Sequence, residues 1–218
     1  MKNLIPLVGI ILLLCVAANA QQATTGVTGK GFKLGFDIAK ISTESKELND
    51  FLDSRSGFIG GAYLTYSLNR QFAVQPEILY VSKGAEKDIF IFGAEWIIDY
   101  LEVPVLLKFN IAPEGRVRPN LFVGPAMSVL LSSKFHIINE EYDVKDGMKS
   151  MDVSLVFGGG VDYKRVIFDV RYTLGLVNTI DAAKVNALTG AEPGNRYYLE
   201  GDPSVKNTNL SFMVGVRF

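Results

Sequence analysis

Apolar and polar side chains alternate along most of this chain with a period of two residues. At residues 209–218 every even position is apolar, and the odd positions are mainly small or polar. The same alternation occurs at residues 101–109 and at residues 166–176, where Asp169 and Arg171 lie between large apolar side chains. Because successive side chains of a β-strand point to opposite faces, the pattern predicts strands with one apolar and one polar face.

Eight segments of this kind follow one another, most of them about ten residues long or longer. They are residues 31–40, 57–68, 71–83, 101–109, 119–132, 151–163, 166–176 and 209–218. Strands of soluble proteins average about 5 to 6 residues, whereas a tilted strand that crosses a bilayer needs about 9 to 11. The lengths therefore favour strands that span a membrane.

The connections between these strands alternate between short and long. Residues 69–70, 110–118 and 163–165 are the shorter joins, and the longer ones are residues 41–56, 84–94, 133–150 and 178–206. Outer-membrane barrels have short turns on the periplasmic side and long loops outside. The pattern predicts an all-β fold, an eight-stranded antiparallel up-and-down transmembrane β-barrel, at residues 21–218.

Aromatic side chains occur near the predicted strand ends, as expected of interfacial belts at the two membrane surfaces. Tyr80 and Trp96 are expected near the rim with the long loops. The opposite rim is expected to carry Phe32, Tyr66, Phe72, Phe109, Tyr163 and Phe218.

The first twenty residues have the pattern of a cleaved signal peptide. Lys2 precedes an uncharged apolar stretch at residues 4–18, and Ala18 and Ala20 supply the small residues of a cleavage site. A permanent membrane anchor is the alternative, but the stretch is shorter than the roughly 20 residues of a spanning helix. The only cysteine, Cys15, lies in this segment. Mature residues 21–218 would therefore have no thiol chemistry.

Several stretches resemble the PorT-like family of outer-membrane β-barrels. They are QPEILY at 75–80, DYLEVPVLLKF at 99–109, GP at 124–125, FGGGV at 157–161 and DVRYTLGL at 169–176. The most specific are the Tyr-Leu-Glu-x-Pro and Arg-Tyr-x-x-Gly segments. The resemblance implies a small outer-membrane barrel, and it implies little about activity because fold does not fix function.

If the apolar face contacts lipid, the other face points into the barrel. The charged residues on it are predicted to be Lys33, Asp37, Glu77, Glu102, Lys108, Asp162, Asp169, Arg171 and Arg217. Acids and bases nearly cancel in this set, and eight strands enclose room for side chains but not for an open channel. We therefore predict a structural charge network that fills the lumen. The alternative is a path for ions or protons.

Candidate chemistry elsewhere is sparse. His136, the only histidine, is near Ser132 and Ser133 in sequence, so a lipid-modifying or ester hydrolase is an alternative function. No nucleophile-elbow pattern surrounds these serines. One histidine and no mature cysteine exclude the usual zinc sites, and the loop acids match no dedicated calcium motif. We expect no catalytic, cofactor-binding or metal residues, and no cofactor.

Charge also bears on partners. The 22 Lys and Arg residues nearly balance the 23 Asp and Glu residues, which gives no electrostatic reason to expect nucleic acid. The expected partners are outer-membrane lipid around the wall and an envelope protein or surface ligand bound by the long loops. The loops would serve either binding or the assembly of an envelope or secretion system. A soluble lipocalin-like carrier is a third hypothesis, but it would need apolar inward side chains. The sequence therefore favours a non-enzymatic barrel.

Overall fold

The computed structural model describes residues 25–43, 53–89, 92–137, 140–195 and 198–218. The expected signal peptide lies outside the described residues, as does most of the predicted loop at residues 41–56.

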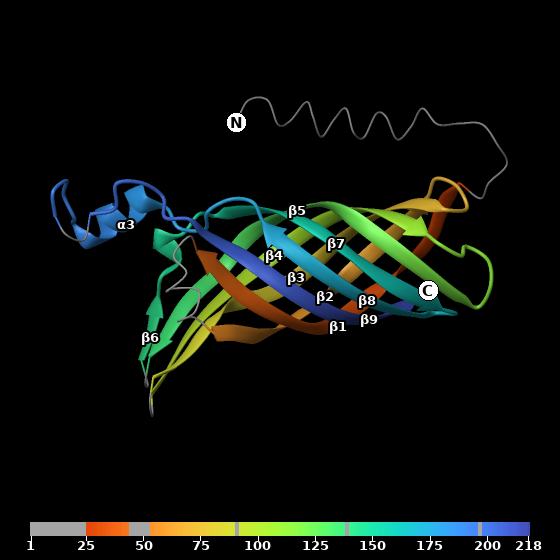
Figure 1. Cartoon of the computed structure of the whole chain (residues 1–218), viewed down its shortest axis with the longest axis horizontal. Helices are drawn as coiled ribbons and strands as arrows, with labels where there is room; N and C mark the ends of the chain where they lie inside the picture. The colour runs from red at the N-terminus through yellow and green to blue at the C-terminus, as the bar shows by residue number, and fades with distance from the viewer. Residues whose placement is uncertain (1–24, 44–52, 90–91, 138–139, 196–197) are drawn as a thin grey trace.

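Eight long antiparallel strands close into a barrel (Figure 1). They are β1 (Gly26–Thr43), β2 (Asp53–Ser67), β3 (Phe72–Ile89), β4 (Phe92–Asn110), β5 (Val117–Ile137), β7 (Met151–Tyr163), β8 (Val166–Gly175) and β9 (Val205–Arg217). Each strand pairs with the next one along the chain, and β9 pairs with β1 from Gly31↔Arg217 to Thr43↔Val205. The predicted eight-stranded up-and-down barrel is confirmed.

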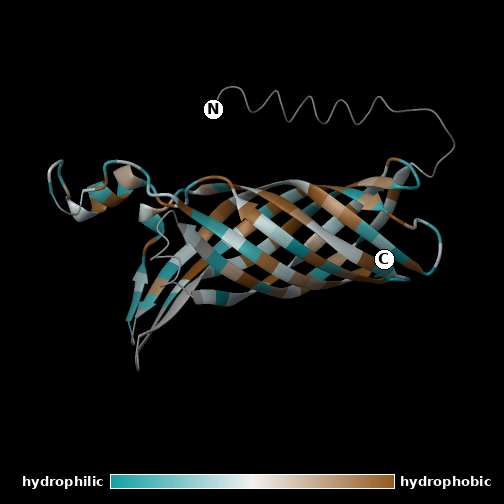
Figure 2. Ribbon diagram, in the orientation of Figure 1, coloured by the Kyte–Doolittle hydropathy of each residue, from teal (hydrophilic) through white to brown (hydrophobic). Residues whose placement is uncertain are grey.

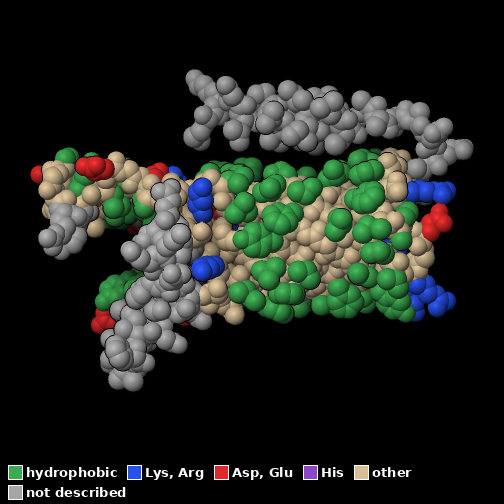
Figure 3. Space-filling view, viewed as in Figure 1, with side chains coloured by type: hydrophobic (Ala, Val, Ile, Leu, Met, Phe, Trp, Pro, Cys, Tyr) green, Lys and Arg blue, Asp and Glu red, His purple; other side chains and the backbone are tan. Residues whose placement is uncertain are grey.

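The outer wall of the barrel is apolar and the interior is polar. On β8, Phe168 and Val170 are 51% and 46% exposed, whereas Asp169 and Arg171 between them are 3% and 1% exposed. The two kinds of residue alternate along the strands in Figure 2, and apolar side chains cover the visible wall in Figure 3. A soluble protein would bury this surface, because exposed apolar patches of such extent are rare in water.

The two ends of the barrel differ. At one end, which we call the inner end, the connections are residues 68–71, 111–116 and 164–165, and the C-terminus also lies there (Figure 1). The tightest of these turns contains Lys164 at φ 54°. In the first turn, the side-chain oxygen of Asn69 accepts hydrogen bonds of 2.8 Å from the N–H groups of Gln71 and Phe72. Aromatic pairs such as Phe72 with Phe109 lie on the wall near this end.

The opposite end, the outer end, carries long projections. The short strand β6 (Glu140–Asp143) extends the β5 hairpin, η1 (Lys145–Gly147) follows it, and α3 (Ala182–Thr189) lies in the last long connection. Helix α3 is capped by Asp181, which accepts a hydrogen bond from the N–H of Lys184, and it ends at Gly190 in the left-handed region. No helix among the described residues is long and apolar enough to cross a membrane.

Two of the predicted outer loops contain extensions of the neighbouring strands. The segment at residues 84–94 was expected to be a loop, but β3 continues to Ile89 and β4 begins at Phe92. Residues 133–137 and 140–143 of the next predicted loop form a hairpin extension as well. The backbone ladder continues beyond the apolar wall, where a strand no longer needs an apolar face. The alternation of apolar and polar side chains therefore ends earlier along each strand than the backbone hydrogen bonds between the strands.

The glycine run in β7 makes room for bulky neighbours inside the barrel. A Cβ on Gly158 would lie 2.8 Å from the ring of Phe122 and would collide with the carbonyl oxygen of Val170. The Phe122 ring in turn lies 5.5 Å from the guanidinium carbon of Arg171. Glycine at this position therefore allows close packing around the central arginine.

Candidate functional site

The structure places the predicted inward charges in the lumen. Arg217, at the inner mouth, has a side chain that is 22% exposed. The other eight residues are each no more than 6% exposed: Lys33, Asp37, Glu77, Glu102, Lys108, Asp162, Asp169 and Arg171. With Arg217 included, the nine residues lie on six different strands. All of them except Asp37 belong to three groups along the barrel.

The central group consists of two bases and two acids. Arg171 donates to both oxygens of Glu77, from Nη1 to Oε2 at 2.7 Å and from Nη2 to Oε1 at 3.3 Å. Lys33 Nζ donates to Glu77 Oε1 at 2.8 Å and also to Asp169. Asp169 lies 3.4 Å from Arg171 Nη2. Every charge in this group has an opposite charge as a neighbour, as expected where solvent is excluded.

The second group lies toward the outer end. Lys83 Nζ donates to Glu102 Oε2 at 2.7 Å, and Ser128 donates to the same oxygen at 3.3 Å. Lys83 Nζ also lies 5.4 Å from the centre of the Tyr100 ring. The Asn207 amide donates to the Tyr100 hydroxyl at 3.2 Å and to Oδ2 of a further buried acid, Asp152, at 3.0 Å, and so connects this acid to the group.

The third group lies at the inner mouth around one carboxylate. Asp162 accepts a hydrogen bond from Lys108 Nζ at 3.1 Å and from the Asn120 amide at 3.2 Å. Nη2 of Arg118 and Nη1 of Arg217 lie 3.7 Å and 3.6 Å from its other oxygen. Three bases therefore share a single acid.

Asp37 is held by neutral partners. Its Oδ1 accepts hydrogen bonds from the Asn209 amide at 2.7 Å and the Ser211 hydroxyl at 2.5 Å. Among the described residues it forms no ion pair within 4.0 Å. The predicted set is thus brought together in the lumen, although Asp37 is not joined to it by a direct salt bridge.

An apolar wall around a charged, side-chain-filled interior is the arrangement of an outer-membrane barrel. The profile of the family described as outer membrane protein beta-barrel domain matches residues 19–181. The chain belongs to this family. It is an integral outer-membrane β-barrel protein. No curated protein is similar enough in sequence to count as a match.

Similar solved structures include three bacterial surface proteins. The attachment invasion locus protein Ail of Yersinia pestis is 13% identical, with a TM-score of 0.45, over 89% of this chain and 100% of Ail. Neisserial surface protein A is 15% identical, with a TM-score of 0.49, over 88% of this chain and 99% of its own. OprG of Pseudomonas aeruginosa is 14% identical, with a TM-score of 0.47, over 92% and 99%.

Charged residues of the outer-membrane barrel's lumen that were missed from the sequence include Lys83, Asp152 and Arg118. Lys83 and Asp152 lie within predicted strands, at positions that alternate in step with the inward acids Glu77 and Asp162, so the alternation already pointed to both. Arg118 lies one residue before the predicted start of its strand, which the structure places at Val117.

An apolar cluster lies at the outer end of the lumen. Met148, from the connection after η1, is 2% exposed and packs with Ile98, Tyr100 and Leu130. Trp96 packs against this cluster and donates from its indole N–H to Ser133 Oγ at 2.9 Å. The expectation that Trp96 belongs to a lipid-facing belt is therefore wrong. Its even-numbered position on β4 is on the inward face, as for Ile98 and Tyr100.

The residues of the hydrolase alternative do not form a catalytic group. His136 lies 3.4 Å from Glu141 Oε2. Ser133 accepts the Trp96 hydrogen bond, and Ser132 donates to Asp99 Oδ2 at 3.1 Å. A strand rises about 3.3 Å per residue, so either serine is about 10 Å or more from His136 along β5. A nucleophile must lie within hydrogen-bond reach of its base.

Among the residues that the structure describes, no group of three or more His, Cys, Asp or Glu side chains is arranged to hold a metal ion. The loop acids that were weighed as calcium ligands include Glu140, Glu141 and Asp143. Glu141 instead pairs with Lys134 at 2.6 Å. That hydrogen bond holds the pKa of the Glu141 carboxyl below its usual range.

Proposed function

We propose that this protein is a non-enzymatic outer-membrane barrel that presents its outer loops to an envelope protein or surface ligand. The observation that carries the proposal is the contrast between the two ends. The inner end has tight turns, whereas the β3–β4 hairpin, the β5–β6 hairpin and the α3 segment all project beyond the outer end (Figure 1). Loops on a rigid scaffold are the usual place for recognition.

A packed lumen supports a scaffold in preference to a channel. The central group pairs Lys33 and Arg171 with Glu77 and Asp169, and all four residues are at most 3% exposed. An eight-stranded barrel encloses just enough space for such side chains. We therefore infer that the charge network is structural and keeps the wall rigid.

Two outer connections are joined into one surface. The N–H of Lys149 donates to the carbonyl of Thr179 at 2.8 Å, and the N–H of Asp181 donates to the carbonyl of Gly147 at 3.1 Å. Lys149 Nζ also lies 2.6 Å from Asp202 Oδ2. A ligand would therefore meet residues 144–150 and the α3 segment together, which favours recognition by a preorganised surface.

The test is capture of surface partners by whole cells that express loop variants. In one variant a short Gly-Ser linker replaces residues 182–200, and in the matched control a linker of the same kind replaces residues 112–115 of an inner turn. Heat-modifiable gel mobility shows that each barrel is folded. The proposal expects a cross-linked partner to be lost only from the outer-loop variant. Equal capture by both variants would contradict it.

The charged, apolar and small residues of positions 2–20 follow one another in the order typical of a cleaved signal peptide, so we also propose that residues 1–20 are removed. Intact-mass measurement of the protein extracted from outer membranes should then give a chain that begins at Gln21. A mass that includes Met1 would refute this part of the proposal.

A further inference from the structure

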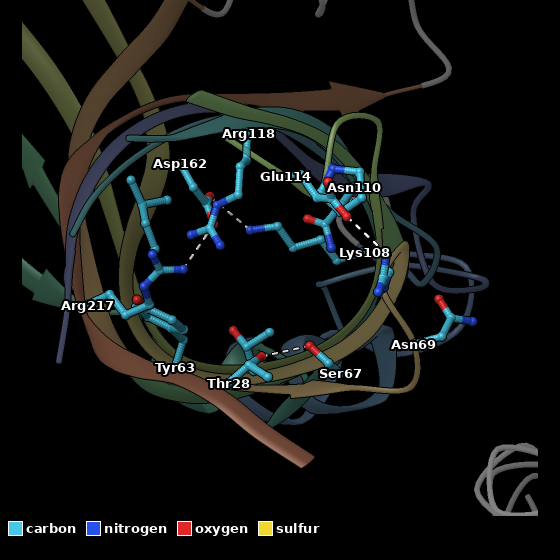
Figure 4. A pocket seen from close by; sticks show the side chains of 14 residues that line it. Thr28, Tyr63, Ser67, Asn69, Lys108, Asn110, Glu114, Arg118, Asp162 and Arg217 are labelled. Atoms are coloured by element: carbon cyan, nitrogen blue, oxygen red, sulfur yellow. Dashed lines mark hydrogen bonds and ion pairs between the residues drawn. The ribbon is translucent and has the colours of Figure 1, made fainter. Parts of the chain in front are cut away.

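The inner end of the barrel opens into a pocket that the display function does not use. Its volume is about 400 Å³, and it is lined by residues from several strands and from two inner turns (Figure 4). Lys108 and Asp162 are among its lining residues, and their side chains are at most 8% exposed. In an outer-membrane barrel the short turns face the periplasm, so the pocket opens on that side.

Basic side chains outnumber acidic ones in this pocket. The bases are Arg70, Lys108, Arg118 and Arg217, and the acids are Glu114 and Asp162. Formal charges therefore leave an excess of two positive charges. Arg70 and Glu114 pair with each other at the exposed rim, at 3.0 Å. The excess thus lies deeper, where three bases converge on Asp162.

An unpartnered hydroxyl lies in the same pocket. Tyr63 is 4% exposed, lines the pocket, and its hydroxyl has no hydrogen-bond partner among the described residues. A buried phenol usually finds an acceptor. In Figure 4 Tyr63 lies beside Arg217 on the pocket wall. A free O–H donor next to guanidinium groups that share a single carboxylate with a lysine is a combination that suits an oxyanion.

We propose that this pocket binds a phosphate group. A phosphate monoester carries close to two negative charges at neutral pH, which matches the excess, and its oxygens accept from arginine in a forked geometry. Arg118 and Arg217 would bind the oxygens, and Tyr63 would donate its O–H to one of them. The pocket is larger than phosphate itself, so the rest of the ligand occupies the space toward Thr28 and Ser67. The group could belong to a soluble molecule of the periplasm or to a lipid headgroup at the rim.

The experiment is titration calorimetry with the full barrel in uncharged maltoside micelles. The probe is inorganic phosphate, with chloride at equal ionic strength as the reference. The proposal expects saturable binding that Arg118→Gln weakens by about tenfold or more, the size of one charge-assisted hydrogen bond. Tyr63→Phe, which removes only the hydroxyl, should weaken it by about threefold to tenfold.

Arg116→Gln is the matched control. Arg116 lies two residues from Arg118, is exposed and does not line the pocket, and its replacement makes the same change of charge. Absence of saturable phosphate binding at millimolar concentration, together with absence of lipid binding, would overturn the proposal. So would an equal loss in the Arg116→Gln and Arg118→Gln variants, because it would show non-specific attraction.

A second arm distinguishes the two sources of phosphate. Phosphatidic acid, whose headgroup is a phosphate monoester, is added to the micelles, and inorganic phosphate is tested as its competitor. Binding of free phosphate that the lipid does not displace indicates a soluble ligand. Lipid binding that depends on Arg118 and Tyr63 while free phosphate fails to bind indicates a headgroup. Both results support phosphate recognition. Binding that neither Arg118→Gln nor Tyr63→Phe weakens would refute it.

Discussion

The sharpest test of the lumen network is removal of one charge from its centre. Glu77 is 1% exposed and accepts hydrogen bonds from Lys33 at 2.8 Å, Arg171 at 2.7 Å and Gln75 at 2.8 Å. Glu77→Gln keeps the size of the side chain but removes its charge. The central group then contains two bases against Asp169 alone, which leaves one positive charge uncompensated in a site without solvent.

The expected cost is large. Breaking a buried ion pair by removing one partner typically destabilises a protein by about 3–5 kcal/mol. With a urea slope of about 2 kcal/mol/M, a loss of about 4 kcal/mol lowers the unfolding midpoint by on the order of 2 M. The measurement is urea unfolding of the barrel in lipid vesicles, followed by heat-modifiable mobility. Glu114→Gln is the control, because its ion pair with Arg70 is exposed and worth at most about 1 kcal/mol.

A double variant separates charge from packing. Combining Lys33→Met with Glu77→Gln leaves Arg171 and Asp169, whose charges balance and lie 3.4 Å apart. The double variant should recover part of the loss, with a coupling of about 0.5–3 kcal/mol. If Glu77→Gln costs no more than Glu114→Gln, the assignment of a tightly coupled buried network is refuted.

Three further predictions concern packing and the outer surface. Gly158→Ala should destabilise the barrel by about 1–3 kcal/mol in urea unfolding, because the added methyl collides with neighbours inside the barrel. Gly159→Ala is the control and should destabilise it clearly less, because the atoms nearest to the added methyl are 3.3 Å away. Equal destabilisation by the two substitutions would refute the packing argument. Met148→Ala should lower the free energy of unfolding by about 2–5 kcal/mol, because it removes packing at the outer mouth, and it should speed protease cleavage of the connection after η1. An unchanged rate of cleavage would contradict this prediction. The hydrogen bond from Lys149 holds the pKa of Asp202 below its usual range, so the stabilisation it gives is complete above the ordinary Asp pKa of about 3.9 and is lost as pH falls through the lowered value. The protection factors of the α3 amides in hydrogen exchange, which are corrected for the intrinsic exchange rate at each pH, should therefore fall only in acid, and Asp202→Asn should abolish that dependence. A fall in protection already at neutral pH would refute it.

Much of the fold could be predicted because its determinants are local. The alternation at residues 166–176 gives the two faces of β8 directly, and the short joins at residues 69–70 and 163–165 fix which strands are neighbours. Strand ends were less predictable. The backbone pairing between β3 and β4 continues from Lys83↔Ile98 to Ile89↔Phe92, beyond the apolar wall. In this part of the strands the alternation of side chains no longer indicates where the backbone is hydrogen-bonded.

The candidate sites could be predicted only in part. The alternation along each strand predicts that Glu77, Asp169 and Arg171 point inward. It cannot predict which of these charges form ion pairs, because Glu77 and Arg171 are 94 residues apart in sequence. The inner pocket was missed altogether. It depends on Tyr63 lying near the group around Asp162, and these residues come from strands that are distant in the chain.

The charged lumen also determines which face of each strand can point outward. A slip of one residue would place Asp169 and Arg171 in lipid and would turn Phe168 and Val170 into the lumen. A basic residue at the bilayer midplane costs about 2–4 kcal/mol, and the displaced charges would also lose their partners. A wholly apolar interior would not oppose this slip, because either face could then contact lipid. The network therefore specifies register more than it adds net stability, which is why loss of Glu77 alone should be worse than replacement of the whole central group by apolar residues.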